Sequence, residues 1–131
     1  MSHFSKIQTS IYDIKLLKKT LIDLGFKYDS SLTSIHDANG RLYKVDLVAK
    51  LYQKSENNLC IGFAWDGDKY SIITDLDFWF NDISFDLFVE KLNQSYSINV
   101  ILDQTINDGF QKINQKNLND GSIKLTVQRW I

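Results

Sequence analysis

The chain has 131 residues, of which 44% are hydrophobic and 13% aromatic, and its formal net charge is -1. This length and composition fit one domain with a real hydrophobic core and exclude a mostly disordered chain. The small net charge excludes a field of the whole molecule that attracts nucleic acid or anionic lipid, so such binding would need a local patch.

The first part of the chain predicts a strand followed by a helix. Residues 2–11 alternate apolar and polar side chains, which indicates a strand. Asp13 is a good N-cap residue, and apolar residues then recur at helical spacing up to Leu24. Gly25 and Phe26 should end this helix, since glycine can supply the left-handed residue after a helix and phenylalanine the apolar contact behind it.

The middle of the chain predicts a meander of three antiparallel strands. Residues 27–40 are rich in turn-forming side chains and indicate a loop or a short irregular strand. Three segments with strand-like alternation follow, separated by two polar turns, and they are residues 42–52, 59–65 and 70–74. Consecutive strands joined by short turns favour hairpins, so all three belong to one sheet.

The last third of the chain predicts a helical region and a hairpin. Residues 75–83 fit neither the helical nor the strand period. Two apolar stripes of helical spacing follow, and they are out of phase with each other, so we expect a bend or break near Ser97. Gly109-Phe110 repeats the helix stop, and a turn at Asn119-Asp120-Gly121 then joins two strands, the second of which runs toward Trp130.

Together these elements predict an α+β fold in a single domain over residues 1–131. The predicted order is β-α-β-β-β-α-β-β, in a single mostly antiparallel sheet. Helices packed on one face of that sheet are the simplest arrangement, because each element has only one apolar side to cover. The pattern leaves the oligomeric state open.

The sequence contains no motif for a cofactor, a metal centre or an active site. A glycine-rich dinucleotide loop, a Walker loop, His-Glu-x-x-His and Cys-x-x-Cys are all absent. Cys60 is the one cysteine, which excludes an intramolecular disulfide and fits a reducing compartment. No apolar run approaches the ~18 residues of a membrane span. We therefore expect no cofactor, no metal site and no membrane association, and we favour a protein that is not an enzyme.

An aromatic and acidic segment is the first candidate for a partner-binding surface. Phe78, Trp79 and Phe80 are consecutive, and Asp82 follows them. Three bulky aromatic side chains in an irregular segment cannot all point inward, and exposed aromatic residues mark sites for partners. The alternative is that they fill the space between a helix and the sheet, because aromatic residues usually dominate cores.

A second set of residues predicts a ligand pocket. Asp75 and Asp77 lie at the end of a strand and face the same side of an extended chain, so they could bind magnesium or calcium or act as acid and base. Their alternative role is to cap a strand end and a helix. Trp65, Tyr70 and Trp130 would line the pocket as a stacking platform.

Lysine side chains on the first helix and on one strand predict a modest basic surface. They are Lys15, Lys18, Lys19, Lys44 and Lys50. RNA binding would need this surface together with stacking aromatic residues. The net charge argues against nucleic acid, and a solvated helix face explains the lysines more simply.

Short motifs along nearly the whole chain resemble one known family in their order and spacing. They are Met1-Ser2-His3-Phe4, Ile61-Gly62-Phe63-Ala64-Trp65-Asp66-Gly67, Gly109-Phe110, Asp120-Gly121-Ser122-Ile123-Lys124-Leu125 and Gln128-Arg129-Trp130. The family is hypothetical chloroplast reading frame thirty-five, an uncharacterised family of similar length from cyanobacteria and red-algal-type plastids. The resemblance implies a plastid protein of the stroma, or a cytoplasmic one if the source is cyanobacterial. It implies no catalytic residue and no cofactor.

Three hypotheses for function follow from the sequence. The first is a non-enzymatic protein-binding or assembly and regulatory module, with a protein partner that the sequence does not identify. The second is a small-molecule or divalent-metal-binding protein or enzyme that uses Asp75 and Asp77. The third is an RNA-binding module.

Overall fold

The computed structural model describes residues 4–37, 40–51, 59–76, 79, 84–107, 109–117 and 123–129, with the backbone alone for residues 59, 110–117 and 123–129. The chain forms two compact units, Met1–Tyr96 and Ser97–Ile131. None of the helices in the described ranges combines the length and the apolarity that crossing a membrane requires.

Helix α1 (Ile14–Asp23) begins and ends where the sequence predicts. The Asp13 carboxylate accepts hydrogen bonds from two backbone N–H groups of the first turn, at 2.9 and 3.2 Å. Gly25 has a φ of 90°, and the Phe26 N–H donates back to the Leu21 carbonyl at 2.9 Å. This six-to-one hydrogen bond over a left-handed glycine is the usual way in which a helix satisfies its last carbonyl groups.

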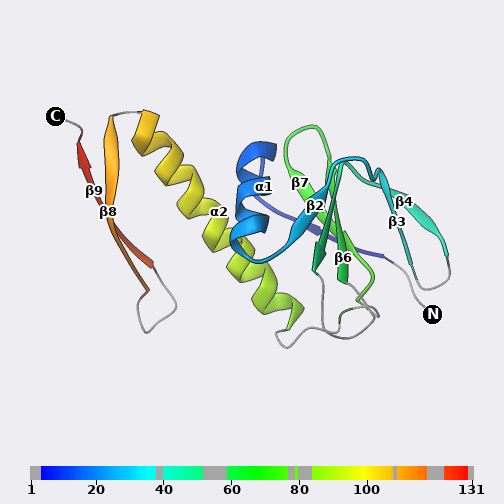
Figure 1. The fold of residues 1–131 in the computed structure, drawn as a ribbon. Helices are drawn as coiled ribbons and strands as arrows, with labels where there is room; N and C mark the ends of the chain where they lie inside the picture. Colours follow the sequence, from blue (N-terminus) through cyan, green and yellow to red (C-terminus); the bar gives the residue numbers. More distant parts are fainter. Residues whose placement is uncertain are drawn as a thin grey trace. The chain divides into compact units, whose positions relative to one another are not determined.

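The larger unit is built on a five-stranded antiparallel sheet in the order β1-β7-β6-β5-β2 (Figure 1). Its strands are β1 (Ser5–Gln8), β2 (Lys27–Asp29), β5 (Leu47–Leu51), β6 (Leu59–Trp65) and β7 (Tyr70–Thr74). Strands β5, β6 and β7 form the predicted meander. The N-terminal strand β1 pairs with β7, and β2 pairs with β5, so both edges of the sheet come from the first 29 residues.

One face of this sheet is covered by helices (Figure 1). Leu47, Phe63 and Ile72 lie side by side on neighbouring strands, and each is at most 1% exposed. Helix α1 and the first half of α2 (Phe85–Asn107) pack over this face. The Tyr96 hydroxyl joins the two helices, because it accepts the backbone N–H groups of residues 12 and 13 at 3.2 and 3.1 Å.

The opposite face carries a small hairpin, β3 (Ser34–His36) and β4 (Leu42–Lys44), which forms a two-stranded sheet of its own. Ile35 and Val45 from this hairpin pack with Val48 and Ile73 of the main sheet. Gly62 permits the close approach, since a Cβ atom there would lie 2.6 Å from Val45 Cγ1. A glycine inside a strand often marks such a contact between backbones and side chains of two layers.

The smaller unit contains the second half of α2 and a separate hairpin, β8 (Phe110–Asn117) paired with β9 (Ile123–Arg129). The predicted hairpin is confirmed, and its predicted turn lies outside the described residues. Of the expected bend or break near Ser97, the break is wrong, because α2 is continuous from Phe85 to Asn107, and the bend stays a prediction. A helix can change the side that it buries along its length without any change in its backbone, so a phase shift in the apolar stripe does not require a bend.

The α+β class is confirmed, and its finer details differ from the sequence prediction. The strands divide among three antiparallel sheets, where one sheet was expected. The predicted strand 42–52 is interrupted at residues 45 and 46, and residues 27–40 hold β2 and β3. The interruption lets β4 pair with β3 and β5 pair with β6, which alternation alone cannot reveal because both halves keep the strand period.

Candidate functional site

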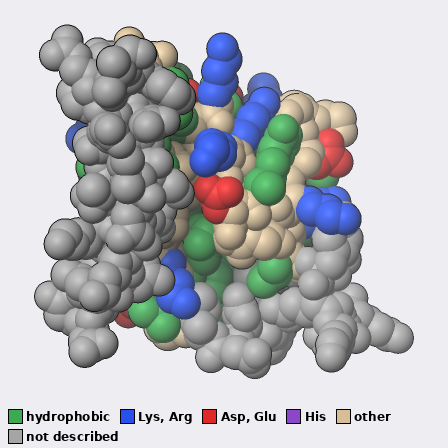
Figure 2. Space-filling model, turned by 60° about the vertical axis from the view of Figure 1, so that its left-hand side comes forward, with side chains coloured by type: hydrophobic (Ala, Val, Ile, Leu, Met, Phe, Trp, Pro, Cys, Tyr) green, Lys and Arg blue, Asp and Glu red, His purple; other side chains and the backbone are tan. Residues whose placement is uncertain are grey.

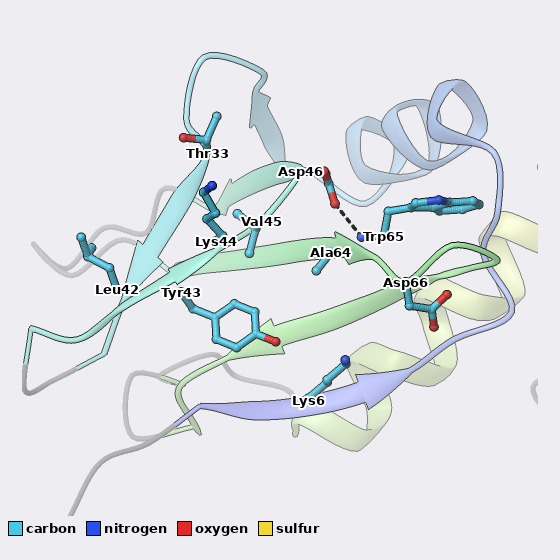
Figure 3. A pocket seen from close by; sticks show the side chains of 10 residues that line it. All are labelled: Lys6, Thr33, Leu42, Tyr43, Lys44, Val45, Asp46, Ala64, Trp65 and Asp66. Carbon is cyan, nitrogen blue, oxygen red and sulfur yellow. Dashed lines mark hydrogen bonds between the residues drawn. The ribbon is translucent and has the colours of Figure 1, made fainter.

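A cavity of about 630 Å³ lies beside the β3–β4 hairpin, on the sheet face away from the helices (Figure 3). We call it the hairpin groove. Its lining comes from β1, from β4 and the residues next to the hairpin, and from the end of β6 and the turn behind it. The lining residues are Lys6, Thr33, Leu42, Tyr43, Lys44, Val45, Asp46, Ala64, Trp65 and Asp66.

The apolar part of the hairpin groove comes from β4 and β6. Alternation along β4 turns Tyr43 and Val45 toward the main sheet, where both join its apolar cluster together with Ala64. The Tyr43 ring packs edge-on against Phe4, with 5.6 Å between the ring centroids. Leu42 points the other way and is 73% exposed at the rim.

Two carboxylates at one end of the hairpin groove are used to hold the local backbone. The Asp46 carboxylate accepts the Trp65 N–H at 2.6 Å. The Asp66 carboxylate accepts the N–H groups of Lys69 and Asp68 at 2.9 and 3.0 Å, and these hydrogen bonds hold its pKa below the ordinary value for aspartate. The Asp66 carboxylate therefore stays ionised at neutral pH, with part of its accepting capacity already filled.

Two ammonium groups complete the lining. Lys6 comes from β1 and Lys44 from β4, so they border the hairpin groove from two different elements (Figure 3). Neither of them forms an ion pair with another residue that the structure describes. The Tyr43 hydroxyl lies between the two strands that carry these lysines (Figure 3). The groove thus presents several hydrogen-bond donors that the described part of the protein does not use.

The predicted pocket residues are brought together only in part. Trp65 and Tyr70 are directly paired across β6 and β7, and their rings contact each other at 4.9 Å between centroids. Burial raises the pKa of the Tyr70 hydroxyl, and the negative charge of Asp46 adds to the effect. Asp75 is buried just beyond the far end of β7. At about 3.4 Å per residue, it lies roughly 17 Å along the strand from Tyr70, so it does not share a site with Trp65 and Tyr70. Asp77 and Trp130 lie outside the described residues.

Trp79 is the one member of the aromatic segment that the structure describes. Its ring is half-buried and contacts Phe85 at 5.1 Å and Phe88 at 5.3 Å between centroids, both on α2. This arrangement matches the alternative in which the aromatic residues fill space beside a helix. Phe78, Phe80 and Asp82 lie outside the described residues.

No group of three or more histidine, cysteine, aspartate or glutamate side chains is placed to hold a metal ion within the described part of the chain. Cys60 is half-buried next to Lys50 on β5, its direct partner across the sheet. Burial raises the pKa of the Cys60 thiol, and the charge of Lys50 only partly offsets that rise. The thiol is accordingly protonated and weakly nucleophilic at neutral pH.

The predicted basic surface is interrupted by other side chains. Figure 2 shows Lys and Arg side chains mixed with acidic and hydrophobic ones on the face turned toward the viewer. On α1, the Lys19 ammonium pairs with Asp23 at 3.6 Å, and the Lys18 ammonium lies over the Tyr28 ring at 5.2 Å. This surface therefore differs from the continuous basic groove with free aromatic faces that single-stranded nucleic acid uses.

Most of the hairpin groove was missed by reasoning from sequence, which selected only Trp65 as a site residue and Lys44 as part of a basic surface. Lys6, Tyr43 and Asp66 are separated by long stretches of chain and meet only because β1 returns to pair with β7. One signal was present in the sequence. Gly62 interrupts an apolar strand and indicates that another element approaches there.

Comparison with known proteins identifies similar sequences over almost the full chain. A family model described as "Protein of unknown function (DUF1257)" matches residues 20–126. A protein of Pyropia yezoensis is 41% identical over 130 residues, which cover 99% of this chain and 98% of the relative. A protein of Guillardia theta is 40% identical over 131 residues, and one of Cyanophora paradoxa is 38% identical over 130, with the same coverage of both chains.

Each of these relatives bears the name "Uncharacterized protein ycf35". The resemblance to hypothetical chloroplast reading frame thirty-five is thereby confirmed, and the relatives indicate a plastid origin. No solved structure matches the chain.

Proposed function

We propose that this chain, which belongs to the DUF1257 family of proteins of unknown function, is a non-enzymatic protein-binding module of the plastid stroma that holds its partner in the hairpin groove. The observation that carries the proposal is the lining of this groove. It combines an apolar floor with two ammonium groups that have no ion-pair partner among the described residues.

The size and shape of the hairpin groove support a binding role. A volume of about 630 Å³ falls within the ordinary range for binding sites in proteins. The groove is open to solvent, so a segment of polypeptide can reach its lining. Leu42 at its rim is 73% exposed, and an exposed leucine beside such a hollow is typical of an interaction surface.

The chemistry of the hairpin groove supports binding more than catalysis. Both carboxylates in its lining accept backbone N–H groups, and no histidine or cysteine is among the lining residues that the structure describes. General acid–base chemistry needs a titrating group that can reach its substrate, and nucleophilic catalysis needs an activated side chain. The groove offers ammonium and hydroxyl donors, which suit recognition of a partner.

The aromatic segment that begins at Phe78 is a separate hypothesis for the partner surface. Its described member, Trp79, contacts Phe85 and Phe88 of α2, so part of its ring is committed to packing. For this reason we place the partner in the hairpin groove. The two locations make different predictions, because Trp79→Ala would remove partners bound by the segment and spare those bound in the groove.

Affinity purification of the tagged protein from its native host tests the proposed function. Ala64→Glu places a longer, charged side chain on the floor of the hairpin groove, and Leu42→Glu changes only an exposed rim residue. Both variants should lose a partner that the wild-type protein retains in stoichiometric amount. Ile22→Glu is the control, since Ile22 is 57% exposed on α1 and does not line the groove. Retention of the partner by both groove variants would contradict the proposal.

A further inference from the structure

We infer that the hairpin groove recognises an acidic side chain on an extended and otherwise apolar segment of the partner polypeptide. This inference rests on the proposed function and specifies the chemistry of the partner. Three features of the groove carry it: the excess of free donors, the position of the two carboxylates and the apolar floor.

The first feature is the balance of donors and acceptors. Lys6 and Lys44 each offer an ammonium group, and the Tyr43 hydroxyl adds a neutral donor between the strands that carry them. None of the three has a hydrogen-bond or ion-pair partner among the described residues. Part of the accepting capacity of the two carboxylates in the lining is already filled by backbone N–H groups. The complementary ligand is therefore rich in acceptors and negatively charged.

The second feature is the pair of carboxylates, Asp46 and Asp66, in the lining. The Asp66 carboxylate is held ionised by the backbone N–H groups that it accepts, and the Asp46 carboxylate accepts the Trp65 N–H. A polyanion that runs through the whole groove would meet both carboxylates and be repelled. The Lys6 charge already acts on Asp66, so the two ammonium groups can hold a ligand with a single anionic group, which meets less repulsion than a polyanion. This arrangement favours a single carboxylate on a polypeptide over the repeated phosphates of a nucleic acid.

The third feature is the apolar floor. Val45 is 6% exposed, Ala64 is half-buried, and the Tyr43 ring lies beside them. Small and aromatic side chains at the bottom of a hollow accommodate aliphatic side chains of a partner. In an extended peptide, neighbouring side chains point to opposite sides, so an apolar residue two positions from the acidic one faces the same surface. An acidic residue with an apolar residue at this spacing matches both parts of the lining.

Fluorescence anisotropy with synthetic peptides tests the inference. The probe is a labelled heptapeptide with one glutamate and leucines two positions away on either side, and its twins carry glutamine or lysine in place of glutamate. At low ionic strength, the glutamate peptide should bind up to about fivefold more tightly than the glutamine twin, because one exposed ion pair supplies at most about 1 kcal/mol. The lysine twin should bind more weakly still.

Matched charge variants locate the effect. The double variant Lys6→Gln/Lys44→Gln should bind the glutamate and glutamine peptides equally. The control, Lys15→Gln/Lys91→Gln, makes the same change in net charge at two exposed helix positions that do not line the groove, and it should keep the preference. All variants are exposed-site changes, and circular dichroism verifies that each is folded.

The outcomes separate this inference from the proposed function. If glutamate and glutamine peptides bind wild-type protein equally and Ala64→Glu abolishes both, the groove holds peptides without recognising acid, and the inference fails while the proposed function stands. If no peptide binds, the inference also fails, and the purification experiment decides the proposed function by itself. If the control variant loses the preference as well, the effect belongs to net charge and the inference is wrong.

Discussion

Gly62→Ala tests how the β3–β4 hairpin docks on the main sheet, and therefore how one wall of the hairpin groove is placed. A Cβ atom at this position would lie 2.6 Å from Val45 Cγ1 and 3.1 Å from Ile35 Cδ1. An ordinary van der Waals contact begins near 3.4 Å, so the distance of 2.6 Å to Val45 Cγ1 is about 0.8 Å too short. Val45 and Ile35 are only 6% and 7% exposed, so relief of the overlap requires a shift of these side chains or of the hairpin that carries them.

The change in the free energy of unfolding that Gly62→Ala causes is the sum of two opposing effects. Extra volume in a well-packed core costs about 1–3 kcal/mol. Replacement of a strand glycine by alanine recovers roughly 0.5–1 kcal/mol, because the unfolded chain has fewer conformations to lose. An overlap of about 0.8 Å with a buried side chain places the packing cost in the upper part of its range, about 2–3 kcal/mol, so the free energy of unfolding should fall by about 1–2.5 kcal/mol.

Val45→Ala supplies the matched control, because it removes the methyl group that the new Cβ atom would meet. By itself this change should cost about 2 kcal/mol, from two buried methyl groups and the space that they leave. The double variant should be no less stable than Val45→Ala alone, which corresponds to a favourable coupling of about 1 kcal/mol or more between the two substitutions.

Urea unfolding followed by circular dichroism measures all four proteins of this cycle. A Gly62→Ala protein as stable as the wild type, or a coupling near zero, would refute the contact between the hairpin and β6. The position of one wall of the hairpin groove would then be wrong as well.

Three further predictions concern single side chains. Tyr96→Phe leaves the backbone N–H groups of Tyr12 and Asp13 without their acceptor, so the free energy of unfolding should fall by about 1–3 kcal/mol. Urea titration measures this change, and an unchanged value would contradict the link between the helices. Backbone N–H groups lower the folded-state pKa of Asp66, so its stabilising contribution is present above the unfolded-state pKa of about 3.9 and is lost as the pH falls through the lower folded-state value. The urea midpoints of the wild type and Asp66→Asn should therefore converge in that acidic range, and a difference that stays constant with pH would contradict this. Because burial raises the pKa of Cys60, iodoacetamide should alkylate Cys60 more slowly in the folded than in the unfolded protein at neutral pH, and the rate should reach its plateau at a higher pH. Equal pH profiles of the folded and unfolded proteins would contradict the raised pKa.

The parts of the fold that depend on neighbouring residues could be predicted from the sequence. Helix α1 was placed correctly at both ends, since Asp13, Gly25 and Phe26 act within a few residues of themselves. The β5-β6-β7 meander was also predicted, because short turns bring successive strands together. In both cases the information is local.

The parts that depend on distant residues could not be predicted in this way. Strand β1 pairs with β7 across more than sixty residues, and nothing in the alternation of either strand identifies its partner. The apolar stripe shifts phase near Ser97, which predicts a bend or a break, and the break is absent because a continuous helix can expose different faces along its length. The hairpin groove arises from such long-range pairings, so its charged lining was not visible as a motif.

The most direct test of the central claim is site-specific photo-cross-linking in the native host. A photoreactive amino acid in place of Leu42 lies at the rim of the hairpin groove, and the same amino acid in place of Ile22 reports on the exposed side of α1. We predict one dominant protein adduct from the Leu42 position, lost when Ala64→Glu is introduced in the same chain, and no such adduct from Ile22. An equal set of adducts from both positions, or an adduct that survives Ala64→Glu, would contradict a partner site in the hairpin groove.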